Sequence, residues 1–164
     1  MSDKSILPEP TQIARLLTNT LAKTVDVSVA PRGVRAPGSV IAVYKNHEGV
    51  PVAAVACEIS VAASLGAALV LIPANTAKEA AAGGSLPDTI YETMYEVFNI
   101  CAQLLRADKT HRMSLDRVYV PGDDIPEDVA AVFKDKEHRA HIHVSVDGYE
   151  SGLVTMGVFA LQSA

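Results

Sequence analysis

The sequence predicts an α+β domain in which a mostly antiparallel sheet packs against long helices. Three observations predict this class. The expected strands and helices arrive in blocks, not in the strict β-α-β alternation of a parallel sheet. Tight-turn residues at 46–49 and 147–148 each separate two apolar segments, which is typical of antiparallel hairpins. Between these hairpins lies a long amphipathic helix, over about residues 85–106.

The chain has 164 residues, enough for one domain with a sizeable core, and we expect that domain to span residues 11–164. Residues 1–10 are polar and contain proline, which predicts a flexible N-terminal tail. A helix is expected over 11–22, because its apolar residues recur at helical spacing. The other expected elements of this half are strands within 23–30, 39–45 and 50–59, and a Pro/Gly loop or irregular edge segment over 30–38.

The second half begins with a helix rich in small residues, over 60–72, which Pro73 ends. Residues 75–85 are small and polar enough for a loop or a frayed turn. After the long helix, the expected elements are a strand over 113–120, a turn at 121–122, a short helix over 126–134, and strands over 140–146 and 152–160.

The start of the long helix has several recognisable signals. Ser85 is the expected N-cap, Pro87 suits the first turn, and Asp88 can complete a capping box with Ser85. If the helix runs to Arg106, its length is about 30 Å.

Composition excludes several classes of function. The formal net charge of −5 and the absence of tryptophan argue against a general nucleic-acid-binding surface. Residues 50–77 are mostly apolar, but Glu58 and Pro73 interrupt them too soon for a membrane span of about 20 residues. Because residues 1–10 also lack the apolar core of a signal peptide, we expect a cytoplasmic protein.

The two cysteines, Cys57 and Cys101, both lie in apolar segments. Their spacing matches no zinc or redox motif, so buried reduced thiols are the favoured interpretation. A disulfide between them is the alternative.

A row of polar side chains follows one face of the long helix. At 100° per residue, the polar residues that fall within about 80° of Glu96 are Asp88, Glu92, Asn99, Gln103 and Arg106. The opposite arc carries the apolar residues Ile90, Met94, Val97, Phe98, Cys101, Leu104 and Leu105. Tyr91 and Tyr95 flank the polar row.

The row has two interpretations. It can be an ordinary solvated face, which is the commoner case. However, Glu92 and Glu96 are like charges one helical turn apart, which costs a few tenths of a kcal/mol. Asn99 is a poor helix former at an exposed position. Both features therefore favour a role in binding or chemistry.

The pair Glu96 and Asn99 has a specific chemical use. Residues at i and i+3 project side by side from one helical turn. A carboxylate can hold a cation of a partner, and an amide can orient a water molecule because it both donates and accepts hydrogen bonds. Such a pair suits the positioning of water for in-line attack on an activated phosphoryl group.

Residues Glu96-Val97-Phe98-Asn99 resemble the E-x-x-N motif of the CheC/CheX/FliY phosphatases, which dephosphorylate phospho-aspartate on CheY-type response regulators. The order of elements over residues 11–160 is similar to that of CheX. The segment "LDRVYVPG" (115–122) also falls where that family has an apolar strand that closes on a Pro/Gly turn. The first helix carries no second E-x-x-N pair, so the resemblance is to a single-site, CheX-like protein.

The resemblance implies a role for each site residue. Glu96 would form a salt bridge with a lysine of the response regulator, and Asn99 would orient the attacking water in its phosphorylated pocket. The Mg²⁺ would belong to the partner, so no metal ligand and no bound cofactor are expected in this chain. Glu92, Tyr95 and Gln103 would contact the partner, and a homodimer is the expected state. Gln103 stands where the family usually has glycine, which would change the docking surface.

Two other functions stay open. In the first, the domain is a non-catalytic binding module whose polar row, with Tyr91 and Tyr95, only docks a partner. The second is a metal site at His138, His141 and His143, since the last two would share one face of a strand. The sequence has neither a GxxxxGK[ST] nor a GxGxxG pattern, and no serine lies in a recognisable hydrolase context.

Overall fold

The structure is a computed structural model, and it describes residues 7–35, 38–105 and 113–159. The chain forms six strands and five α-helices in these ranges. The elements are α1 (Pro10–Leu21), β1 (Val25–Val29), β2 (Val40–Lys45), β3 (Pro51–Cys57), α2 (Ile59–Leu69), α3 (Ala74–Gly83), α4 (Asp88–Cys101), the 3-10 turn η2 (Ala102–Leu104), β4 (Ser114–Tyr119), α5 (Glu127–Val132), β5 (Arg139–Val146) and β6 (Gly152–Val158).

All six strands join one sheet in the order β1-β5-β6-β3-β2-β4, and every neighbouring pair is antiparallel. The predicted hairpins β2–β3 and β5–β6 are present. The α+β class and the antiparallel sheet that the sequence predicts are therefore confirmed.

The sheet has a thick helical layer on one face. Helices α1, α2 and α4 share a single apolar core with the inward side chains of all six strands. The predicted helix over 11–22 corresponds to α1, and its apolar face is buried at Ile13, Leu17 and Leu21. Leu7, within the predicted tail, is also buried in this core, and residues 1–6 lie outside the described ranges.

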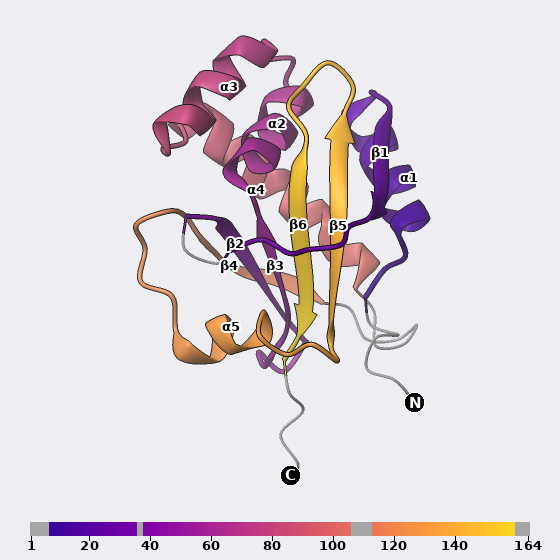
Figure 1. Cartoon of the computed structure of the whole chain (residues 1–164), viewed down its shortest axis with the longest axis vertical. Helices are drawn as coiled ribbons and strands as arrows, with labels where there is room; N and C mark the ends of the chain where they lie inside the picture. The colour runs from indigo at the N-terminus through magenta and orange to yellow at the C-terminus, as the bar shows by residue number, and fades with distance from the viewer. Residues whose placement is uncertain (1–6, 36–37, 106–112, 160–164) are drawn as a thin grey trace.

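The opposite face is covered by short elements. Helix α5 packs a second apolar cluster on β2 and β3, and the segment of residues 30–35 crosses β5 and β6. In Figure 1, α4 passes behind β5 and β6 while this crossing segment lies in front of them. The crossing is close, because a side chain at Gly33 would collide with His141 and Thr155. Because both faces are covered, all of β6 is buried.

Two local predictions are wrong. Residues 74–83, which lie largely within the predicted loop, form helix α3; its Ala, Lys and Glu residues are strong helix formers, and Ala77 is buried against α2. The predicted Ser85 cap is also absent, because α4 begins at Asp88 with Pro87 as its extended N-cap. A start at Ser85 would require Leu86 to be helical directly before a proline, which is sterically disfavoured.

The α-helical part of the long helix is shorter than predicted. It ends at Cys101 and continues only as the 3-10 turn η2. Arg106, the predicted end, lies outside the described residues. No helix within the described ranges is both long enough and apolar enough to span a membrane.

Candidate functional site

Helix α4 presents the predicted polar row to solvent. Its side chains Asp88, Glu92, Glu96 and Asn99, together with Gln103 in η2, are all exposed. Its core face is buried at Ile90, Met94, Val97 and Phe98. The helix is therefore divided into a solvent-exposed face and a core face, as the sequence predicts. Arg106, the last predicted member of the row, lies outside the described residues.

The side chains on the outward side of α4 form two ridges. Side chains four residues apart lie one above the other on a helix. One ridge is acidic and consists of Asp88, Glu92 and Glu96. The second consists of Tyr91, Tyr95 and Asn99, and Gln103 follows it in the 3-10 turn. Glu96 and Asn99 are therefore neighbours across the line between an acidic ridge and a tyrosine–amide ridge.

The functional groups of Glu96 and Asn99 are free to contact a partner. Within the described part of the chain, neither side chain takes part in a hydrogen bond or an ion pair. A side chain whose bonding groups face only water loses little when a partner replaces that water. The two residues can thus grip and orient groups on another molecule without first breaking internal contacts.

A buried tyrosine holds the helix end that carries Asn99. The Tyr44 hydroxyl, on β2, donates a 2.7 Å hydrogen bond to the carbonyl oxygen of Phe98. Burial raises the pKa of the Tyr44 phenol well above its usual range, so this donor keeps its proton. At the same point the Ala102 N–H donates to the carbonyls of Asn99 and Ile100, as the helix tightens into η2. The bond from Tyr44 therefore fixes the backbone next to Asn99.

Helix α2 sets the position of α4 from the other side. Every residue from Val61 to Ala68 is buried. Gly66 is the point of closest approach, because a Cβ there would lie 2.5 Å from the Ile90 carbonyl oxygen and 3.0 Å from the Thr93 Oγ1. Thr93 marks the edge of α4 that faces α2, and its hydroxyl donates back to the carbonyl of Thr89. Because residue 66 is glycine, the backbones of α2 and α4 can approach each other this closely.

The tyrosines occupy the edge of α4 away from α2. Their ring centroids are 6.3 Å apart with the planes tilted by 43°. Tyr91 is half-buried, whereas Tyr95 is 37% exposed. Partial burial, the nearby Tyr95 and Asp123 of the β4–α5 loop, in that order, raise the pKa of the Tyr91 phenol. The charge of Asp123, far from α4 in the sequence, is thus one cause of the raised pKa of Tyr91.

Both cysteines are free thiols behind the core face of α4. Cys57 and Cys101 line a small apolar cavity between the helices and the sheet. Burial raises the pKa of the Cys101 thiol to about 12. Both thiols are thus protonated and unreactive near neutral pH, as expected for packing groups. Both cysteines are reduced, as predicted, and not joined in the alternative disulfide, but only Cys57 is fully buried, whereas Cys101 is half-buried.

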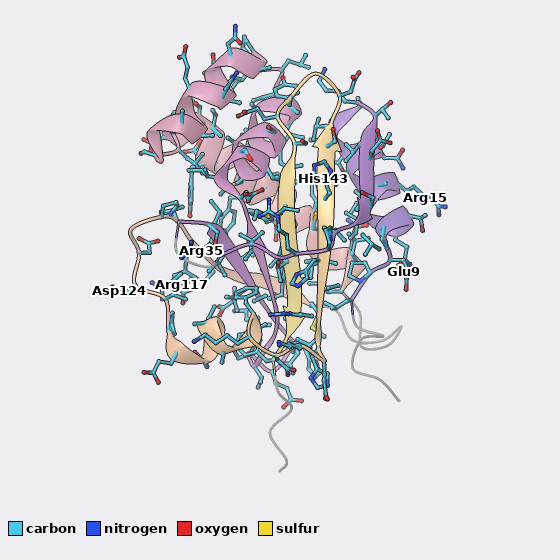
Figure 2. All side chains as sticks on the ribbon, in the orientation of Figure 1. Glu9, Arg15, Arg35, Arg117, Asp124 and His143 are labelled. Carbon is cyan, nitrogen blue, oxygen red and sulfur yellow. The ribbon has the colours of Figure 1, made fainter. Side chains whose placement is uncertain are left out.

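The three histidines do not form a metal site. His141 and His143 lie on one face of β5, as expected, and Figure 2 labels His143 there. However, His141 Nδ1 is hydrogen-bonded to Thr155 Oγ1 at 3.0 Å, and His138 Nδ1 lies 2.7 Å from an Asp135 oxygen. No group of three His, Cys, Asp or Glu side chains within the described ranges could hold a metal ion.

The other clefts lie away from the predicted residues. One, of about 460 Å³, is lined by Arg32, Arg35 and Lys78 together with Glu58 and Glu150. A second, of about 600 Å³, lies between the crossing segment and the β4–α5 loop. Neither contains a residue of the α4 row, which is an exposed helix face.

The fold is similar to that of several solved structures. FliY from Thermotoga maritima aligns over 90% of this chain and 82% of its own, with 13% identity and a TM-score of 0.51. The FliM middle domain from H. pylori aligns over 92% and 84%, with 7% identity and a TM-score of 0.50. The chemotaxis protein CheX from Desulfovibrio desulfuricans aligns over 90% and 94%, with 14% identity and a TM-score of 0.46.

At such low identities, the likeness to FliY and FliM concerns the fold alone. The chain therefore has a CheC/CheX/FliY-like fold, as its sequence predicts. Scans against family models and curated proteins found no match. The single-motif, CheX-like form and the roles of the site residues stay predictions.

Proposed function

We propose that this chain is a CheX-like phosphatase that hydrolyses the aspartyl phosphate of a CheY-type response regulator, in chemotaxis or another two-component pathway. One observation carries the proposal: Glu96 and Asn99 project side by side, exposed and without internal partners in the described chain, from a helix whose backbone is tightly held. A rigid helix can present both groups to a partner with little further ordering.

The proposed chemistry requires no base from this chain. In phosphoryl transfer the enzyme mainly positions the attacking water and stabilises charge. The Asn99 amide would accept a hydrogen bond from the water and direct its oxygen in line with the scissile P–O bond. Glu96 would form an ion pair with a lysine of the regulator and hold the two proteins in register. The acyl phosphate would then be cleaved to aspartate and inorganic phosphate.

Mg²⁺ would be supplied by the acidic pocket of the regulator, where it neutralises the phosphoryl oxygens. Glu92, Tyr95 and Gln103 lie on the same surface as the pair and would contact the regulator. A cytoplasmic location and a homodimer are parts of the same proposal.

The test is the rate at which a phosphorylated regulator loses its phosphate. A CheY-type regulator encoded in the same genome would be phosphorylated with acetyl phosphate, and its decay followed on a phosphate-affinity gel. We expect the wild-type chain to accelerate the decay, and Asn99→Ala to reduce the acceleration by about 100-fold or more. Asn75→Ala, an exposed asparagine on α3, is the matched control and should leave the rate unchanged.

The second candidate is a non-catalytic binding module with the same fold. Gln103 favours it, because this exposed side chain follows Asn99 on the same edge of the helix and stands where the family usually has glycine. This alternative predicts binding of the regulator with no change in decay rate. Gln103→Gly separates the two: acceleration that appears only in this variant would mean that the native chain binds without catalysis.

A further inference from the structure

A cleft between the crossing segment and helices α2 and α3 lies outside the proposed α4 site. Its volume of about 460 Å³ is within the range of sites for small organic ligands. In Figure 1 the crossing segment runs below α2 and α3 in the view. The lining residues come from these elements, from residues 38–39 and from Glu150 of the β5–β6 loop, and none belongs to α4. The cleft is therefore a separate candidate for ligand binding.

Two walls of the cleft are anchored to the same strand, β6. The Val34 N–H donates to Thr155 Oγ1 at 2.9 Å, which holds the crossing segment on β6. The start of α2 is held two residues away, because the Leu153 N–H donates to Glu58 Oε1 at 2.6 Å and the Glu58 N–H donates to the Leu153 carbonyl at 3.0 Å. Since β6 is fully buried, the spacing of the two walls is fixed before a ligand binds, and binding costs less entropy.

Three cationic side chains line the cleft: Arg32 and Arg35 from the crossing segment, and Lys78 from α3. All three are exposed, and within the described ranges none of them makes a hydrogen bond, an ion pair or a ring contact. The chain has a formal net charge of −5, yet in this cleft the cations outnumber the two carboxylates, Glu58 and Glu150. The fold thus gathers positive charge at one place on an acidic protein.

The two carboxylates do not neutralise these cations by direct pairing. Glu58 accepts the Leu153 N–H, which offsets part of its charge, and Glu150 is exposed in the β5–β6 loop. Neither forms an ion pair with a described residue. The carboxylates can instead accept hydrogen bonds from hydroxyl or amino groups of a ligand.

The first turn of α2 adds backbone donors to the same cleft. Ile59 and Ser60 line it, and their N–H groups have no backbone acceptor within the described chain, whereas the Val61 and Ala62 N–H groups donate to the Glu58 carbonyl. No side chain caps this helix start, and its first turn contains no acidic residue. Free N–H groups and the positive end of a helix dipole both favour a bound anion, and they supplement the three side chains here.

We propose that this cleft binds the phosphate group of a small organic ligand. Arg32, Arg35 and Lys78 would contact the phosphate oxygens together with the N–H groups of the first turn of α2. Guanidinium groups bind phosphate through two parallel hydrogen bonds, and a phosphate has more terminal oxygens than a carboxylate to share among several donors. Glu58 and Glu150 would accept hydrogen bonds from the rest of the ligand. The proposal goes beyond the proposed function and is independent of it.

The test is a titration of the ¹⁵N-labelled chain with pyrophosphate and with inorganic phosphate, followed by ¹H–¹⁵N NMR at constant ionic strength. We expect the amide signals of Gly33, Ile59 and Ser60 to shift and to reach saturation. Pyrophosphate should bind more tightly than phosphate, because it carries more charge and more oxygens. Arg35→Gln and Lys78→Gln should each weaken pyrophosphate binding about fivefold or more, since each removes one cation from the cleft.

Two substitutions of the same kind outside the cleft are the matched controls. Arg15→Gln removes an exposed arginine of α1, and Lys136→Gln removes an exposed lysine of the turn before β5. Both should bind pyrophosphate as the wild type does. Because all four substituted side chains are exposed, each variant should keep the fold, and its ¹H–¹⁵N spectrum shows directly whether it does.

Each outcome supports or overturns the phosphate site. Weaker binding in both cleft variants, with unchanged binding in both controls, would support it. Equal losses in cleft and control variants would reveal only non-specific attraction, and shifts that never saturate would overturn the site as well. Tighter binding of citrate than of pyrophosphate would replace the phosphate by a carboxylate ligand. Dephosphorylation of a response regulator depends on none of these results, so it tests the proposed function separately.

Discussion

Helix α4 and strand β5 each carry a group of polar side chains that stands out in the sequence, yet the structure uses the two groups differently. On β5, His141 is tied to Thr155 on the neighbouring strand, and Gly33 of the crossing segment lies against both. On α4, Glu96 and Asn99 have no such contacts in the described chain. His141 is thus tied into the fold, whereas the α4 pair is available to a partner.

The largest expected change in stability comes from a substitution on the buried face of α4, compared with one on its exposed face. Met94 is fully buried only two residues from Glu96. Met94→Ala should lower the free energy of unfolding by about 2–5 kcal/mol, because it removes core contacts and leaves a cavity. Asn99→Ala should change it by less than about 0.5 kcal/mol. Urea denaturation measures both, and a strongly destabilised Asn99→Ala would mean that Asn99 is a structural residue.

The next effect tests the close contact between α2 and α4. Gly66→Ala places a methyl group 2.5 Å from the Ile90 carbonyl oxygen, so the helices must separate. We expect a loss of about 1–3 kcal/mol. Gly83→Ala, in α3, has no atom within 4 Å of the new methyl group and should be neutral or stabilising by up to about 1 kcal/mol. Equal unfolding midpoints for the two variants would disprove the close contact.

A smaller effect tests the hydrogen bond from Tyr44 to the Phe98 carbonyl, next to Asn99. Tyr44→Phe leaves the buried Phe98 carbonyl without its donor, which should cost about 1–2 kcal/mol. Amide hydrogen exchange should become faster at Ala102, where the helix tightens. Tyr95→Phe removes an exposed hydroxyl and is the control, with an expected change below about 0.5 kcal/mol. Unchanged exchange at Ala102 in Tyr44→Phe would show that this bond does not hold the helix end.

The smallest effect concerns β5. Burial and the nearby Arg139 lower the pKa of His141 below its usual value of 6.5. As the pH falls through about 6.5, the unfolded chain therefore takes up this proton before the folded chain does, and the free energy of unfolding decreases. His141→Gln should show a shallower loss of stability between pH 7.5 and pH 5, measured by urea denaturation. A variant with the same slope as the wild type would show that His141 does not contribute.

Much of the fold could be predicted because its signals are local. Alternating or helical spacing of apolar residues marks α1, α4 and the strands, and turn residues at 46–49 and 147–148 mark the hairpins. Helix α3 was missed because its small residues have no apolar periodicity, and only its contact with α2 explains its burial at Ala77. The prediction of an N-cap at Ser85 is wrong because Pro87 disfavours a helical conformation at Leu86.

The sequence by itself determined the outward row of α4 and the pairing of Glu96 with Asn99, since helical spacing alone places them together. Only the tertiary structure decided what surrounds that pair. The bond from Tyr44 to Phe98 joins residues 54 positions apart, and Gly66 lies against α4 where the two helices cross. Contacts of this kind depend on how the whole chain packs, and no local pattern of residues encodes them.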